Sequence, residues 1–183
     1  MDEIINRVRY LLGDTSQSMS DIFTYGSSAV FTLSEPNVIS VTDVYRNDVA
    51  SGVTHTYSST TKKVTISSSL TSGDTIQVDY TYYPNYSNTE LTNHIQSTLV
   101  YLSIHNYYTF SYDSTDNSIY PDISDKEKNL IALVTSFLIE PNNQTIRLPD
   151  ITVSPQDNMS MQDKINRVIS AYKKDSHGLL ELI

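Results

Sequence analysis

Residues 75–91 read TIQVDYTYYPNYSNTEL, and the spacing of the apolar residues changes within this stretch. From Ile76 to Tyr82 every second residue is apolar or aromatic, which is typical of a strand with one buried face. Pro84 ends this alternation. Ser87 and Glu90 then form a Ser-x-x-Glu capping box, which predicts the start of a helix. The stretch therefore marks the border between a β module and a helical part of the chain.

Upstream of this border, residues 29–83 carry the β pattern. Their alternating runs are rich in Thr, Val and Tyr, which suit a pleated surface, and turn signals separate the runs. We expect about five short strands that form a small antiparallel sandwich or barrel. The segment before them, Asp14 to Ser28, is polar and rich in serine, and we interpret it as a loop.

The remaining residues favour helices. Residues 2–12 place apolar side chains at helical spacing, and Gly13 follows as a left-handed cap. A second helix is expected from residue 88 to about Phe110, followed by a polar loop over 111–123. Ser124 and Glu127 form another capping box before a run that is apolar on most sides, which indicates the most buried helix. A last helix is expected over 161–175, with cationic side chains in its last turn.

These patterns predict an α+β protein. Residues 1–28 and 84–183 are expected to form a small bundle of about four helices, and residues 29–83 an inserted β module. The bundle would include an extended arm or short hairpin at about 141–160 and an apolar tail.

Composition limits the possible functions. The 183 residues include 12 Lys and Arg against 21 Asp and Glu, for a net charge of -9. This acidic balance argues against tight binding to a phosphate backbone. The chain has no cysteine, which excludes disulfides, thiolate zinc sites and cysteine nucleophiles. We find no signal-peptide pattern and no apolar run long enough for a bilayer span, so no membrane partner is expected.

Motifs for chemistry are also lacking. The 5 glycines are too far apart for a phosphate-binding loop. His94 and His105 would lie on one helix face but about 16 Å apart along its axis, too far to share a metal ion. We therefore expect a protein that is not an enzyme, with no catalytic residue, no metal site and no cofactor.

Two features are candidates for partner binding. Tyrosine is abundant, with 14 Tyr against 4 Phe, and Tyr57 and Tyr82 lie in the β module. A Tyr ring can pack while its hydroxyl meets water, so these residues could form an interface or simply build the faces of the sheet. The second feature is the apolar tail, which could anchor a partner, pack on its own bundle or stay disordered. Its candidate anchor residues are Leu179, Leu180, Leu182 and Ile183.

Residues 5–14, INRVRYLLGD, resemble the opening of head-to-tail adaptor proteins of tailed bacteriophages. The Pro-bounded arm and the last helix are similar to the same family, and Leu70 to Tyr80 looks like β modules of phage neck and tail proteins. A β module between the first two helices is a departure, because many minimal adaptors lack one.

This resemblance implies a structural protein in the neck of a virion, assembled from subunits made in the host cytoplasm. It implies a ring of copies of the chain, usually twelve, that docks on the portal protein and contacts a tail, stopper or tail-terminator protein. Genomic DNA would pass through the ring without sequence-specific binding. The alternatives are a tail-completion or stopper protein and, from another class, a carbohydrate-binding module built on Tyr57 and Tyr82.

Overall fold

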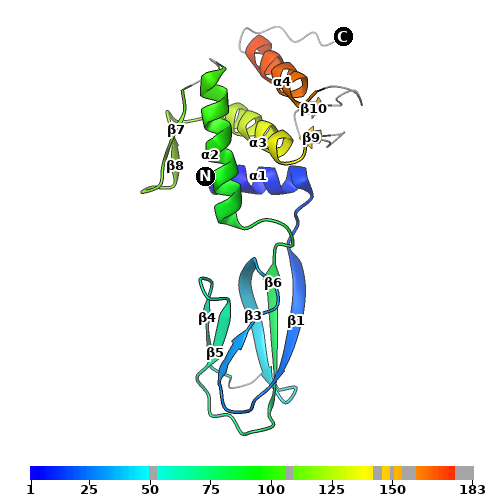
Figure 1. Cartoon of the computed structure of the whole chain (residues 1–183), viewed down its shortest axis with the longest axis vertical. Helices are drawn as coiled ribbons and strands as arrows, with labels where there is room; N and C mark the ends of the chain where they lie inside the picture. The colour runs from blue at the N-terminus through cyan, green and yellow to red at the C-terminus, as the bar shows by residue number, and fades with distance from the viewer. Residues whose placement is uncertain (50–52, 106–108, 142–145, 149–150, 154–159, 176–183) are drawn as a thin grey trace. The chain divides into compact units, whose positions relative to one another are not determined.

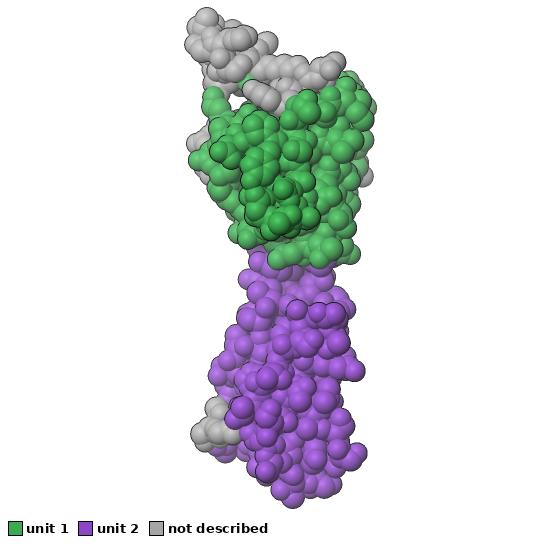
Figure 2. All heavy atoms as spheres, turned by 90° about the vertical axis from the view of Figure 1, so that its left-hand side faces the viewer, with its two compact units in different colours: residues 1–13, 88–183 green, residues 14–87 purple. Residues whose placement is uncertain are grey.

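The computed structural model describes residues 1–49, 53–105, 109–141, 146–148, 151–153 and 160–175. The chain divides into two compact units, which Figure 2 colours separately. One unit consists of Met1–Gly13 and Asn88–Ile183 and contains the helices; the other, Asp14–Ser87, contains a β fold. The predicted α+β class is confirmed, with four helices among the described residues and β strands between the first two of them.

The β unit contains two antiparallel sheets of three strands each (Figure 1). The first has the order β1 (Gln17–Thr24), β6 (Thr75–Tyr82), β3 (Val38–Arg46), and the second β2 (Val30–Thr32), β5 (Lys63–Ile66), β4 (His55–Ser58). Both sheets contribute to one apolar core, and the described strands close no barrel, so the arrangement is a small sandwich. The buried core residues are Phe31, Leu33, Val44, Val64, Ile66, Ile76, Val78, Tyr80 and Tyr82.

β1 corrects the prediction of a loop over Asp14 to Ser28. Eight consecutive residues of this strand pair with β6, from Gln17 opposite Tyr82 to Thr24 opposite Thr75. The β unit therefore begins well before residue 29. The strand is hard to recognise in the sequence because its outer face is exposed and can carry serines in place of apolar residues. On the inner face, Phe23 packs against the core.

The helical unit is built around α3 (Asp125–Ile139). α1 (Asp2–Leu12), α2 (Asn88–Ile104) and α4 (Met161–Asp175) all pack against it. Leu130 to Phe137 is buried without interruption, which confirms that this is the most buried helix. Its predicted start is also confirmed, because Ser124 accepts a bond from the Glu127 backbone and Glu127 accepts one from the Ser124 backbone.

Two hairpins complete this unit. β7 (Ser111–Asp113) pairs with β8 (Ser118–Tyr120), so the predicted loop over 111–123 contains a hairpin, and α2 ends at Ile104 rather than near Phe110. Asn117 has a left-handed φ of 57° in the turn, and buried Ile119 anchors β8. In the predicted arm, β9 (Ile146–Leu148) pairs with β10 (Ile151–Val153) as a short hairpin.

Candidate interaction surfaces

The outer face of the sheet β1-β6-β3 is a hydrogen-bonded polar surface. Asp79 lies in its centre and accepts bonds from Ser20 Oγ at 2.6 Å and Gln77 Nε2 at 2.8 Å. At the Tyr82 end, the hydroxyls of Ser40 and Thr81 are 3.1 Å apart. The bonds from Ser20 to Asp79 and between Ser40 and Thr81 join neighbouring strands on this face.

The inner face holds a second polar network beside the edge strand. Asp21 on β1 accepts bonds from the Ser34 backbone N–H at 2.8 Å and from the Tyr80 hydroxyl at 3.0 Å. Ser34 Oγ also donates to Asp21 Oδ1 at 2.5 Å. Tyr80 is 1% exposed, and burial, the largest cause, raises the pKa of its hydroxyl. The carboxylate of Asp21 thus links the edge strand β1 to Ser34, which follows β2 in the chain.

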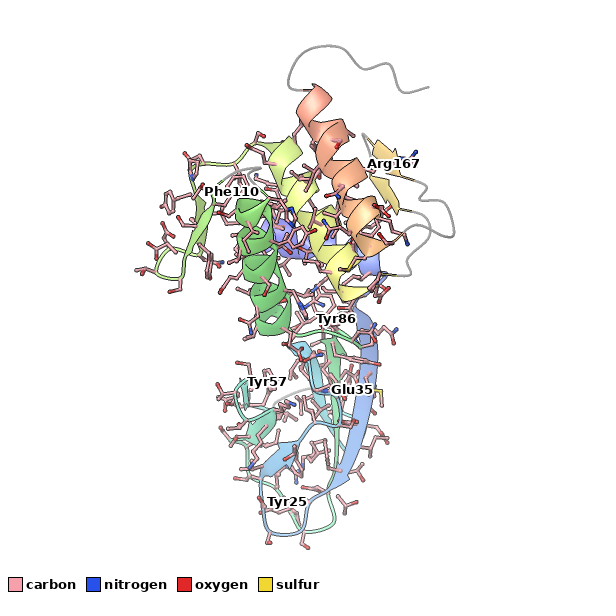
Figure 3. All side chains as sticks on the ribbon, turned by 45° about the horizontal axis from the view of Figure 1, so that its top comes forward. Tyr25, Glu35, Tyr57, Tyr86, Phe110 and Arg167 are labelled. Atoms are coloured by element: carbon pink, nitrogen blue, oxygen red, sulfur yellow. The ribbon has the colours of Figure 1, made fainter. Side chains whose placement is uncertain are left out.

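Tyr82, a candidate for partner binding, lies in the core of the β unit. Its ring belongs to the core and is 9% exposed, and its hydroxyl donates to Gln17 Oε1 at 3.2 Å. Tyr57 on β4 is half-buried beside the same core (Figure 3), and burial raises the pKa of its hydroxyl. The ring of Tyr82 therefore helps to build the inner face of the sheet, as one of the two interpretations of the tyrosines expected.

The helical unit presents an outward apolar pair on α2. Val100 and Ile104 are one turn apart and are 60% and 71% exposed. The opposite face of α2 is firmly packed, because Leu99 and Leu102 are buried and Thr98 Oγ1 lies 2.8 Å from Thr135 Oγ1 of α3. Val100 and Ile104 are therefore exposed on one face of a helix whose opposite face is packed against α3.

Ionic contacts fix α1 to the start of α3. Arg7 Nη1 donates to the backbone oxygen of Asp125 at 2.9 Å, and Lys128 Nζ donates to Glu3 Oε2 at 2.6 Å. Glu3 also pairs with Arg7. The bond from Lys128, the largest cause, lowers the pKa of Glu3, and the reciprocal bond raises the pKa of Lys128. Arg7, which belongs to the INRVRYLLGD stretch, thus serves the packing of its own unit together with Glu3.

The candidate anchor residues of the tail, Leu179, Leu180, Leu182 and Ile183, lie outside the described residues. In the part of the chain that is described, no group of three or more His, Asp or Glu side chains is placed to hold a metal ion. None of the described helices combines the length and apolar character that a bilayer span requires.

β1 is the exposed edge strand that the sequence prediction missed. The available signal was the alternation of Met19, Phe23 and Tyr25 on one side of a run that is otherwise made of small polar residues.

The chain matches none of the known protein-family models, and the search of curated proteins gives no significant match either.

Proposed function

We propose that this chain is a structural protein of a tailed-phage neck, a ring-forming head-to-tail adaptor that docks on the portal and links the capsid to the tail. The resemblance of residues 5–14 to the opening of such adaptors motivates the class. The structural observation that carries the proposal is the outward pair of Val100 and Ile104 on α2. Two large aliphatic side chains in water on a firmly packed helix favour a contact with another chain.

In this function α2 supplies part of the contact between neighbouring copies. A ring with one rotation axis uses two different surfaces of each subunit, one on each side. Burying Val100 and Ile104 against the next copy would contribute roughly 1.5–3 kcal/mol for each side chain before ordering costs. Repetition of a modest contact around a closed ring makes the whole assembly stable.

The charge of the chain supports a channel function. With a net charge of -9, a ring of many copies repels the phosphate backbone instead of holding it. DNA could then slide through the ring without binding to its wall. The adaptor would do no chemistry of its own and would act by shape, position and repulsion.

The test is assembly with portal particles, followed by mass photometry and negative-stain imaging. The expected result is a ring of additional density at the portal. A double variant, Val100→Ser with Ile104→Ser, should keep the fold and lose the ring, whereas the control Val30→Ser, at a side chain that is 42% exposed in the β unit, should assemble normally. A protein that stays monomeric and joins neither portal nor tail would contradict the proposal.

The related role of a stopper or tail-completion protein differs in its partner. An adaptor binds the portal directly, whereas a completion protein binds the tail tube. Co-sedimentation with isolated portal and isolated tails, in separate experiments, distinguishes the two roles.

A further inference from the structure

Among the described residues, no strand pairs with one long edge of the β unit. β1 is the outer strand of its sheet, with β6 on one side and no described strand on the other (Figure 1). In an antiparallel strand, alternate residues direct both their N–H and their C=O to the same neighbour. Tyr25 N donates to Asp74 O at 2.8 Å, so the odd-numbered residues of this strand face β6. The backbone groups of Ser18, Ser20, Ile22 and Thr24 therefore point to the open edge.

The opposite edge of the sheet is built differently. β3 pairs with β6 through two register shifts, one between Val38 and Ser40 and the other between Val41 and Asp43. Such bulges interrupt the ladder and protect an edge from further pairing. β1 has no bulge in its eight residues and contains no Pro, Lys or Arg, so of the devices that protect an edge it carries only the inward-pointing charge of Asp21.

The side chains of β1 also suit a neighbouring strand. Ile22 lies on the outer face and is 67% exposed, although its cross-strand partner on β6 is Gln77. The only charge on the strand is Asp21, whose carboxylate faces inward and is bound by Ser34 and Tyr80. An approaching strand would thus meet an aliphatic side chain and free backbone groups, with no unpaired charge.

We propose that this edge is an interface between two copies of the chain, in which β1 pairs antiparallel with β1 of the second copy around a two-fold axis. The two sheets would join into one continuous sheet of order β3-β6-β1-β1-β6-β3. A second copy is the occupant that these observations favour, because two identical strands can pair antiparallel through their open-edge backbone groups and bring their exposed isoleucines together, while the Asp21 carboxylate of each copy is bound within its own unit.

Physical considerations select one register. An axis at Asp21 would set two carboxylates opposite each other, which is unfavourable. An axis at Ser20 would leave Ile22 opposite Ser18. An axis at Ile22 sets the two isoleucines against each other on the outer face and pairs Ser20 with Thr24 of the second copy. In this register the open-edge groups of Ser20, Ile22 and Thr24 all find partners.

This contact is separate from the proposed ring. A two-fold contact uses the same surface on both copies and closes with two subunits, whereas a ring requires two different surfaces on each subunit. The proposed β1 pairing therefore applies to the chain before it joins a ring. The β1 proposal can be rejected by experiment while the proposed adaptor function still holds.

The first test measures the mass of the full chain by sedimentation equilibrium. The wild type should show a monomer–dimer equilibrium, and Ile22→Lys should weaken the dimer at least tenfold because two cations would meet at the axis. The matched control is Ile39→Lys, which changes a 45% exposed isoleucine on the bulged edge and should leave the dimer intact. Circular dichroism checks that both variants fold.

The second test traps the register. The chain has no cysteine, so Ile22→Cys introduces the only thiol. Residues in a hydrogen-bonded antiparallel pair have Cα atoms about 5.5 Å apart, within the range that a disulfide spans. Mild oxidation should therefore link Ile22→Cys into dimers much faster than Ile39→Cys or Ser18→Cys.

Several results would overturn the proposal. These are a wild type that is monomeric at all concentrations, a self-association that Ile22→Lys leaves unchanged, and equal cross-linking of the three cysteine variants. A ring on the portal that forms normally from Ile22→Lys, without any free dimer in the wild type, would reject the β1 interface and keep the adaptor function.

Discussion

Arg46 Nε lies 2.7 Å from Asp74 Oδ2, and this ion pair joins the end of β3 to the turn before β6. The same carboxylate accepts bonds from the Thr71 backbone N–H at 2.7 Å and from Asn47 Nδ2 at 2.8 Å. Gly73 beside it has a φ of 95°, which favours glycine in this turn. One buried acidic residue thus organises the turn that positions β6, the central strand of its sheet.

Replacement of this carboxylate should destabilise the β unit. Bonds from the Thr71 backbone N–H, the largest cause, and from Asn47 and Arg46 lower the pKa of Asp74. Because its folded pKa lies below its unfolded value, the stabilisation is fully present above the unfolded pKa and is lost as pH falls through the folded pKa. Asp74→Asn should therefore lower the urea midpoint at neutral pH, and its deficit should shrink in acid. The control is Asp43→Asn, at an exposed position, which makes the same change of charge.

The capping box of α3 should contribute measurably to the helical unit. Ser124→Ala removes the oxygen that accepts the Glu127 N–H and should cost about 1 kcal/mol of unfolding free energy. Ser124→Asp should keep most of that stability, because Asp is an equally good N-cap. Urea denaturation followed by circular dichroism measures both variants. Equal midpoints for Ser124→Ala and the wild type would show that this cap does not limit stability.

Leu133 and Ile104 provide a matched test of buried against exposed aliphatic residues. Leu133 on α3 is 0% exposed, so Leu133→Ala should cost about 2–5 kcal/mol. Ile104 on α2 is 71% exposed, so Ile104→Ala should change stability by less than about 0.5 kcal/mol. Thermal melting measures both. If Ile104→Ala destabilised the chain as much as Leu133→Ala, Ile104 would have to be part of the packed unit rather than of an interaction surface.

The sequence predicted the elements whose signals are local. α3 was predictable because Ser124 and Glu127 mark its start and a long apolar run follows. β6 was predictable because its inner face, from Ile76 to Tyr82, is buried in strict alternation. In both cases the buried positions must be apolar, so the buried face of the element is visible in the sequence.

The missed elements have weaker patterns. β1 and the hairpin of β7 and β8 expose most of their side chains, so serine, aspartate and asparagine are tolerated where apolar residues would otherwise reveal a strand. β1 also pairs with a strand that is distant in the sequence, and the turn between β7 and β8 is bound by a distant group, because the Met1 amino group donates to Asn117 O at 3.1 Å. The exposed surfaces could not be predicted from the sequence either. Local sequence patterns do not show that the ring of Tyr82 is buried while Ile22 is exposed.

The boundary of the β unit leads to a prediction about deletions. Replacing residues 14–87 with a short Gly/Ser linker should leave a soluble helical unit, because this segment contains all six strands of the sandwich. Replacing only residues 29–83 would leave β1 without β6 and should reduce solubility. Helical circular dichroism and sedimentation measure the outcome. Loss of helical signal in the 14–87 replacement would show that the helices depend on the β unit.

The final prediction concerns the tail and the docking proposed for this chain. Residues 179–183 are apolar except for Glu181 and follow Gly178. Five such residues gain little on the surface of their own subunit, but each Leu or Ile buried in a groove of a partner could contribute roughly 1.5–3 kcal/mol before ordering costs. Deletion of Leu179 to Ile183 should therefore leave the melting temperature unchanged and abolish co-sedimentation with portal particles. A variant with Glu181→Gln alone, which keeps every apolar side chain, should still dock. Normal docking of the truncated chain would reject the anchor, and a large drop in melting temperature would assign the tail to the core of its own unit.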